Sequence, residues 1–491
     1  MAYQLADFPF LTTLLLCCVA GLLAILATPA RHTRAIKIVS AVFSGLTLVI
    51  SIYLFIAYDQ QAGGYQFVER VAWIPELGIA YFNGVDGFAL PMLLLTGIVF
   101  FTAVLTCWEM ELRVKEFFAL VFLLVAGVFG LFMSLDLFFI FVWFDVSLFP
   151  MYLLIAIWGS TRKEYGAMKL TLYLLAGSAL ILPAIVYLVV HSGAMTFDLL
   201  VLMEGDRFTP AQQRIAFFLL YIGFGILAGV FPFHTWSPVG HVAAPTAVSM
   251  IHAGVLMKIG AFGILRVGIF LCPEGWQFWA PLMAVLATCG IVYGTFVGLN
   301  QTDLKYVIGY SSVAHMGIVG LGLSTMTIDG LNGAVFQMFA HGIMTALFFS
   351  SVGYIYDRTH TKAIAELGGL SRIMPRASSF FILAALTGIG VPCLASFWGE
   401  LVVFMSCVRV YPVAGALAIG ALAVGALFML RVVQKTCYGP PLEKFVALKD
   451  ITAGLAVPRI ILASVIVLFG LFPGLLFDMI HTATMQLIGL R

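Results

Sequence analysis

The sequence predicts an all-α polytopic membrane protein with about fourteen transmembrane helices, and three observations support this fold class. Of the 491 residues, 62% are hydrophobic and only 10% are charged, whereas roughly 25% of the residues in an ordinary soluble domain are charged. The mean hydropathy is +1.08, and apolar runs long enough to cross a bilayer follow one another along the whole chain. The basic residues fall mostly on one side of those runs.

The individual spans follow from the apolar runs, and the connections between them leave no room for a soluble domain. The 432–458 connection carries mixed charge with Pro440 and Pro441, so we expect a lateral segment that is a candidate amphipathic surface helix. The predicted spans are 8–27, 37–57, 85–107, 117–134, 136–158, 167–190, 214–231, 243–271 with a broken lead-in, 278–298, 305–323, 330–354, 377–406, 412–431 and 459–482.

The 25 Lys and Arg residues predict the orientation of these spans. If the N-terminus lies outside, seventeen of them fall in the odd-numbered loops, on the cytoplasmic side. The five on the opposite side are Arg70, Arg207, Arg214, Arg409 and Arg491, and the three within spans are Lys169, Lys258 and Arg266. Because basic residues concentrate in cytoplasmic loops, both termini are predicted to face the outer side.

Other features narrow the classes of function. The formal net charge is only +2, so no nucleic-acid partner is expected. The eight cysteines form no CxxC motif and no Cys/His cluster, so we expect neither a zinc site nor an iron–sulfur site in this chain. The first run begins at Phe8 without a basic region before it or an A-x-A cleavage site, which predicts a retained first helix.

The stretch 217–266 is apolar but is interrupted by prolines. Pro232, Pro238 and Pro245 remove backbone donors and clash with the preceding turn, so a helix here must break within the membrane. Such a break is tolerated only in a protein-lined, usually wet, interior. A second interrupted span contains Pro392, and paired broken helices are typical of transporters that are built from inverted repeats.

Ionisable residues at membrane depth form the candidate site. Asp145, Lys258 and Glu400 lie among apolar residues, where an isolated charge costs about 3 kcal/mol or more and is normally kept for a function. Histidines titrate near neutral pH and add proton-accepting positions. Those that join the candidate site are His234, His252, His315 and His341. These seven residues predict a proton path, provided that water fills the gaps between them.

Each candidate also has a purely structural explanation. An intramembrane carboxylate such as Asp145 or Glu400 can anchor helix packing through a hydrogen bond. A lysine such as Lys258 can extend its ammonium toward the membrane surface, and a core histidine can simply be hydrogen-bonded. We assign His241 and Trp236 the structural role of fixing the break.

Six long motifs resemble one known family. They are DVSLFPMYLLIAIWG (145–159), PFHTWSP (232–238), HVAAPTAVS (241–249), AGVLMKIGAFGILR (253–266), QTDLKYVIGYSSVAHMG (301–317) and QMFAHG (337–342). Over essentially the whole chain, the sequence resembles the antiporter-like subunits of respiratory complex I, the NADH-quinone oxidoreductase subunit M or chain 4 family. The resemblance implies two inverted five-helix repeats with discontinuous helices 7 and 12. It assigns helices 1–3 to residues 1–116, helices 4–8 to 117–271, helices 9–13 to 272–431, and a lateral segment with helix 14 to 432–491.

The resemblance also implies roles for individual residues. Asp145 stands at the position of the family's helix-5 glutamate, Lys258 at that of the helix-8 lysine and Glu400 at that of the helix-12 glutamate, and His315 and His341 match family histidines. Two positions depart from the family pattern. Asp145 is one methylene shorter than the glutamate, and the family's helix-7 lysine aligns with Leu227. We therefore hypothesise that Asp145 couples to Lys258 or His234 instead, with His252 helping.

The implied function is proton translocation in the membrane arm of a NADH:quinone oxidoreductase, where quinone reduction drives proton pumping. This chain would hold no cofactor and perform no redox chemistry. NADH, FMN, iron–sulfur clusters and quinone would belong to partner subunits, among them neighbouring antiporter-like subunits. The implied location is the bacterial inner membrane, with both termini periplasmic.

Two alternatives remain open from the sequence. The chain could be a subunit of a membrane-bound hydrogenase or of a multi-subunit Na⁺/H⁺ antiporter, in which case the coupling ion could be sodium. It could also be a structural membrane-arm subunit that no longer conducts ions.

Overall fold

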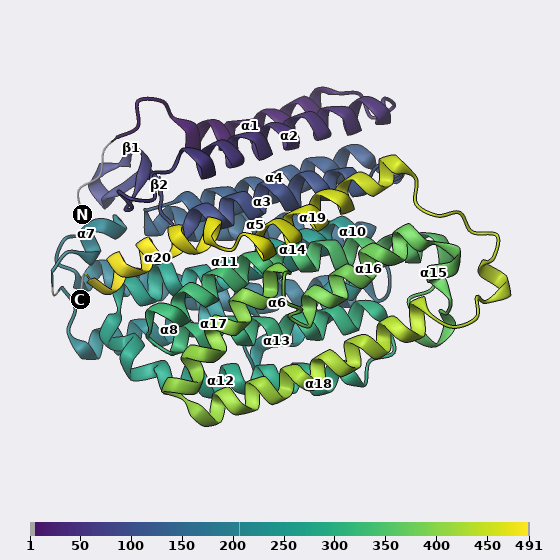
Figure 1. Cartoon of the computed structure of the whole chain (residues 1–491). Coiled ribbons are helices and arrows are strands. Elements are labelled where there is room, and N and C mark those ends of the chain that lie inside the picture. The colour runs from purple at the N-terminus through teal and green to yellow at the C-terminus, as the bar shows by residue number, and fades with distance from the viewer. Residues whose placement is uncertain (1–4, 206, 490–491) are drawn as a thin grey trace.

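The computed structural model describes residues 5–205 and 207–489, and it is a bundle of long helices that share one general direction (Figure 1). Within these residues, thirteen helical segments are long and apolar enough to cross a membrane. They are α1 (Phe10–Ala27), α2 (Thr33–Ala57), α3 (Ala89–Thr106), α4 (Val114–Met133), α5 (Leu137–Trp158), α6 (Lys163–His191), α8 with α9 (Pro210–Ala243), the run from α10 to η4 (Thr246–Ile269), α12 (Pro273–Leu299), α13 (Leu304–Ser324), α14 (Ile328–Thr359), α18 (Pro412–Cys437) and α19 (Ala453–Leu471).

The remaining predicted crossing, at 377–406, is a pair of shorter helices. These are α16 (Pro375–Gly388) and α17 (Ala395–Val410), and the turn between them contains Pro392. These thirteen segments and this broken pair therefore account for the fourteen predicted crossings. The last span extends further than predicted, because α20 (Gly474–Gly489) follows α19 after Pro473.

The seventh span is broken, as the discontinuous helix 7 of the family resemblance implied, but its bounds differ from those of the apolar runs. The prediction ended this span at residue 231 and gave the proline-rich stretch to the eighth. In the structure α8 (Pro210–Ala228) is followed by a short 3₁₀ turn, η2 (Phe233–Thr235), and by α9 (Trp236–Ala243), which completes the seventh span. The eighth span begins only at Thr246, because Ala244 adopts extended backbone before Pro245, as a residue before proline usually does.

The eighth span alternates between two kinds of helix. α10 (Thr246–Ile251) and α11 (Met257–Gly263) are α-helical, whereas η3 (His252–Leu256) and η4 (Ile264–Ile269) are wound as π-helix. Short π segments are rare and occur frequently at functional sites. This span and α14 are buried on all sides, whereas α1, α2 and α18 expose most of their surface. The two central elements are therefore well placed to hold polar groups away from lipid.

A β-hairpin interrupts the predicted all-α architecture in the connection between the second and third spans. β1 (Gln66–Ile74) pairs antiparallel with β2 (Ile79–Val85) around the 3₁₀ turn η1 (Pro75–Leu77). We call the end of the bundle that carries it the hairpin end; the short helix α7 (Leu199–Met203) lies there too (Figure 1). The first and last described residues also lie at this end, as an even number of crossings requires. Arg491, one of the five basic residues that were predicted to lie on the outer side, is outside the described residues, as are residues 1–4.

The predicted amphipathic helix in 432–458 is wrong. α18 continues to Cys437, and the only helical turn before α19 in this described segment is η6 (Glu443–Phe445). Gly439 has a φ of +94°, and Pro440 and Pro441 follow it, so the backbone cannot continue as a helix. Two further short elements, η5 (Ile364–Glu366) and α15 (Leu370–Ile373), lie between α14 and α16.

Candidate ion-translocation site

Four of the seven predicted site residues form one buried row through the centre of the bundle. Lys258 Nζ lies 2.7 Å from His341 Nδ1. The rings of His341 and His315 are stacked with their centroids 5.0 Å apart, and His315 Nε2 lies 3.3 Å from Glu400 Oε1. These residues come from α11, α14, α13 and α17, and each is at most 3% exposed. The row therefore joins four separate spans through titratable side chains alone.

The π-helical segment η3 supports Lys258 at the start of the row. Its ammonium donates a hydrogen bond to the carbonyl oxygen of Ala253, which lies within η3. A fully buried ammonium needs such acceptors because it has lost its water. Lys258 is thus held between a backbone dipole and an imidazole, and none of its contacts within the described part of the chain is a carboxylate.

The orientation of His315 follows from its own helix. Its Nδ1 lies 2.7 Å from the carbonyl oxygen of Ser311, one turn earlier in α13. A carbonyl only accepts, so Nδ1 carries a proton, and Nε2 is the nitrogen that faces Glu400. A cavity of about 20 Å³, which is room for about one water molecule, borders this ring and Ser311.

The break between α16 and α17 positions Glu400 at the other end of the row. Gln337 Nε2 donates a hydrogen bond of 3.3 Å to Glu400 Oε1. Gly390, in the turn, has a φ of +70°, and a Cβ atom there would lie 2.3 Å from Glu400 Oε2. Only glycine combines this left-handed backbone with so close an approach. The broken helix therefore brings its turn directly against the carboxylate.

A pair of histidines extends the polar interior beside Lys258. The rings of His252 and His241 have centroids 4.3 Å apart, and the Trp236 ring stacks on His252 at 5.1 Å. Both imidazoles are fully buried, and none of their four nitrogens has a hydrogen-bond partner among the described residues. Buried polar atoms are normally hydrogen-bonded, so water is the partner that fits here. His241, which the sequence analysis treated as structural, thus belongs to the polar interior; its proximity to the break at Pro238 and Pro245 was the available signal.

His234 stands apart from this cluster. It lies in η2, where the Phe231 and Tyr293 rings flank it with centroids at 5.5 and 4.8 Å. Both of its ring nitrogens are buried, and neither has a hydrogen-bond partner in the described part of the chain. His234 therefore lies apart from the row, within the break of the seventh span.

The described residues include no group of three or more His, Cys, Asp or Glu side chains that could hold a metal ion. What the row can do chemically is to accept, hold and pass protons. Residues 134–425 match the family described as NADH:quinone oxidoreductase/Mrp antiporter, TM. This chain belongs to that family.

Members of this antiporter family include sequences of similar length. The NADH-quinone oxidoreductase subunit M of Rickettsia typhi is 33% identical over 456 residues, which cover 92% of each chain. The NAD(P)H-quinone oxidoreductase chain 4 2 of Microcystis aeruginosa is 35% identical over 402 residues, or 82% of this chain and 72% of that one. The predicted family resemblance is therefore confirmed.

Solved structures of the antiporter family share the fold. A chain of respiratory complex I from Thermus thermophilus superposes with a TM-score of 0.90 at 26% identity, over 98% of this chain and all of that one. A chain of the Mrp complex from Dietzia sp. gives a TM-score of 0.87 over 98% of each chain; its identity is only 21%, so it shows the fold alone. The predicted polytopic helical fold is confirmed.

The family's other acidic position, Asp145, has different surroundings. Its carboxylate is half-buried and accepts a hydrogen bond of 2.8 Å from Ser178 Oγ on α6. The contacts of the described residues do not join it to Lys258, His234 or His252, so the direct pairing that we hypothesised is wrong. α5 packs mainly against α4 and α6, whereas Lys258 lies in α11, His234 in η2 and His252 in η3.

Leu227, which the family resemblance aligned with a lysine, lies in the last turn of α8 and is 3% exposed. Phe224, one turn earlier, contacts Phe144, the residue before Asp145, with ring centroids 6.5 Å apart. α8 and α5 therefore meet near Asp145, and the Leu227 side chain is part of the apolar core.

Proposed function

We propose that this chain is a proton-translocating membrane-arm subunit of a NADH:quinone oxidoreductase of the complex I type. The observation that carries the proposal is the buried row Lys258–His341–His315–Glu400. A row of four titratable groups without lipid contact costs free energy to fold, and such groups within a membrane mark ion pathways. The relatives named NADH-quinone oxidoreductase subunit M support the type of complex.

The row would pass protons in short steps. When Lys258 carries a proton, His341 Nδ1 at 2.7 Å is close enough to accept it. His341 Nε2 is buried without a partner in the described protein, so water beside the stacked rings can carry the proton on to His315. Glu400 then accepts from His315 Nε2 across 3.3 Å. Each step moves one proton, so Lys258 must be protonated again and His341 must move its proton from Nδ1 back to Nε2 before the next transfer.

The ligand chemistry of the row favours the proton over sodium. Sodium, like other hard cations, prefers several oxygen ligands. Three of the four side chains in the row offer nitrogen, and an ammonium repels a metal cation. Glu400 is the one side chain among these four that offers oxygen, with the amide of Gln337 beside it. We therefore assign the proton as the coupling ion.

The driving reaction would take place in partner subunits. In this proposal NADH, FMN, iron–sulfur clusters and quinone are held by those partners, and electron transfer changes the electric field at one end of the row. Neighbouring antiporter-like subunits would flank the chain in the membrane arm. Both termini would face the periplasm, since the basic residues favour the opposite end of the bundle for the cytoplasm.

The test is made in the assembled complex in sealed membrane vesicles. Lys258→Met and Glu400→Gln each remove one titratable member, so we expect at least a ten-fold loss of NADH-driven proton uptake. Glu116→Gln, which changes an exposed glutamate on α4, is the matched control and should behave as the native chain. Subunit content of the purified complex checks assembly. Native rates and a native proton-to-electron ratio in both site variants would contradict the proposal.

A further inference from the structure

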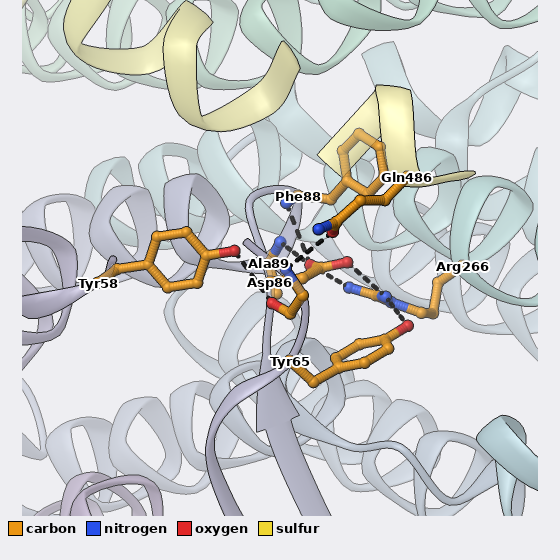
Figure 2. Close-up of polar contacts among 8 residues, drawn as sticks. Tyr58, Tyr65, Asp86, Phe88, Ala89, Arg266 and Gln486 are labelled. Carbon is orange, nitrogen blue, oxygen red and sulfur yellow. Dashed lines mark hydrogen bonds and ion pairs between the residues drawn. The ribbon is translucent and has the colours of Figure 1, made fainter. Parts of the chain in front are cut away.

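Arg266, at the hairpin end, shows how this chain holds a buried cation that keeps its charge. Its Nη1 donates to Asp86 Oδ2 at 2.8 Å and to the hydroxyl of Tyr65 at 2.7 Å, and its Nη2 donates to Asp86 Oδ1 at 2.5 Å. Figure 2 shows the guanidinium facing the carboxylate, with Tyr65 beside both groups. An arginine does not lose its proton in a protein, so this ion pair is a fixed structural contact.

Lys305 is a buried cation at the opposite end of the bundle, and its partners are different. Nine of the spans precede it, so α13 begins at the end away from the hairpin. Lys305 is only 3% exposed, and its Nζ donates a hydrogen bond of 2.8 Å to the carbonyl oxygen of Ala244. Within the described part of the chain, none of the hydrogen bonds of this ammonium goes to a carboxylate.

Lys305 is held in a similar way to Lys258, the first member of the row. Lys305 donates to the carbonyl oxygen of Ala244, which follows α9 at the break. Lys258 donates to the carbonyl oxygen of Ala253 within η3, besides its contact with the row. A lysine, unlike an arginine, can lose its proton inside a protein. Lys305 can therefore exchange a proton, which Arg266 cannot do.

Two buried histidines lie between these two lysines. Electrostatic interactions join His241 to Lys305 on one side and to Lys258 on the other. The His241 ring centroid lies 4.3 Å from that of His252, and His252 immediately precedes the carbonyl that Lys258 binds. The four ring nitrogens are buried without a partner among the described residues, which leaves them for water. Titratable side chains thus connect Lys305 with the start of the row.

The other side of Lys305 lies close to the surface of the bundle. The N–H of Leu304 donates to the carbonyl oxygen of Lys362 at 3.0 Å, and Lys362 Nζ donates to the hydroxyl of Thr161 at 3.3 Å. Thr161 is exposed, in the connection between α5 and α6. Polar groups therefore extend from the neighbourhood of Lys305 to the solvent at this end.

We propose that Lys305 takes up protons at the end opposite the hairpin and reloads Lys258 through His241 and His252. This inference rests on the proposed function. The neutral Lys305 amine binds a proton from solvent and releases it, through water, to His241. Each histidine accepts a proton on one ring nitrogen and releases one from the other. His252 releases its proton to Lys258, whose amine is neutral after it has protonated His341. One proton enters for each proton that the row passes on.

The first test separates proton transfer from helix capping. Lys305→Arg keeps a cation that can donate to the Ala244 carbonyl, but its guanidinium cannot release a proton. We expect NADH-driven proton uptake by the assembled complex in sealed vesicles to fall at least five-fold, with unchanged subunit content. Lys163→Arg is the matched control, because Lys163 Nζ also donates to a carbonyl in the last turn of a helix, that of Ile157 at 3.0 Å, away from the route. Native uptake in Lys305→Arg would overturn the entry route.

The second test interrupts the route at its first histidine. His241→Gln replaces the imidazole by an amide that hydrogen-bonds but does not carry a proton. We expect proton uptake to fall at least five-fold, and to fall no further when Lys305→Arg is added, because both residues act in one path. Losses that multiply in the double variant would overturn the shared path. If Lys305→Arg does not assemble, native uptake in His241→Gln alone overturns the route.

A comparison with the row distinguishes this inference from the proposed function. If Lys258→Met abolishes proton uptake while Lys305→Arg and His241→Gln support native uptake, the entry route fails and the proposed function stands. If all three variants support native uptake, the proposed function fails with it.

Discussion

The two halves of the molecule treat their intramembrane acids differently. In the second half Glu400 stands at the end of a row that reaches Lys258 through two histidines, and every member is buried. In the first half Asp145 is half-buried, and its hydrogen bond is to Ser178. A carboxylate becomes part of a path only where neighbouring spans bring titratable groups into contact with it.

The two broken spans show the same contrast. The turn after α16 places Gly390 against Glu400, whereas the turn after α8 places Gly229, with a φ of +73°, against the end of the Met257 side chain. Both turns require glycine for their backbone, but only one of them touches a titratable group. A break in a helix places a turn within the bundle, and the side chains packed against that turn determine whether it contacts a titratable group.

The largest expected difference comes from filling these two turns. Gly390→Ala and Gly229→Ala both force alanine into left-handed backbone, so each should destabilise the protein by about 1–3 kcal/mol. Only Gly390→Ala also displaces the Glu400 carboxylate, so we expect a further loss of proton pumping of at least five-fold. Thermal unfolding and pumping assays measure the two effects. Gly420→Ala, on an open helix surface, is the control, and equal pumping in both turn variants would remove the functional contrast.

A smaller difference is expected between the two aspartates that begin helices in each half. Asp136 accepts from the backbone N–H groups of Phe138 and Phe139 at the start of α5, and Asp303 does the same for Lys305 and Tyr306 at the start of α13. Asp136 is fully buried, and this burial raises its pKa from 3.8 to about 6 despite the N–H groups that favour its charged form.

The sign of the resulting pH dependence follows from proton binding. Because the folded state holds the Asp136 proton more tightly than the unfolded chain does, this contribution to stability is complete below pH 3.8 and is lost as pH rises through about 6. Between pH 5 and 7 the loss is about 1 kcal/mol. Asp136→Asn should abolish this part of the pH dependence in thermal unfolding, and Asp303→Asn should not. An unchanged pH profile in Asp136→Asn would contradict the burial argument.

The smallest expected effect tests whether the first half can be given a partner for its acid. Leu227→Lys places an ammonium in the apolar core on α8, which contacts α5 near Asp145, so it should destabilise the chain by about 1–3 kcal/mol. The loss should be greater by about 0.5–1 kcal/mol when Asp145→Asn is also present, because the carboxylate then no longer offsets the new charge. A double-mutant cycle in thermal unfolding measures this coupling. Additive effects would show that the two positions do not interact.

The sequence predicted more of the fold than of the contacts. Apolar runs located the crossings, and Pro232, Pro245 and Pro392 located the breaks, because these signals act within a few residues of the chain. The hairpin was missed because its strands, 66–74 and 79–85, lie in a connection between two spans, and that connection was judged only as too short for a soluble domain. The ion pair of Arg266 with Asp86 was missed because its members are 180 residues apart.

By itself, the sequence determined that the chain lies in a membrane, where its helices break and which titratable residues sit at membrane depth. These properties follow from hydrophobicity and backbone chemistry, which each residue carries with it. Only the tertiary structure decided which of those residues meet. Lys258 and His341 are brought together across 83 positions, while Asp145 is turned toward Ser178. Helix packing makes that choice, because close contact between spans depends on the shapes of many side chains at once.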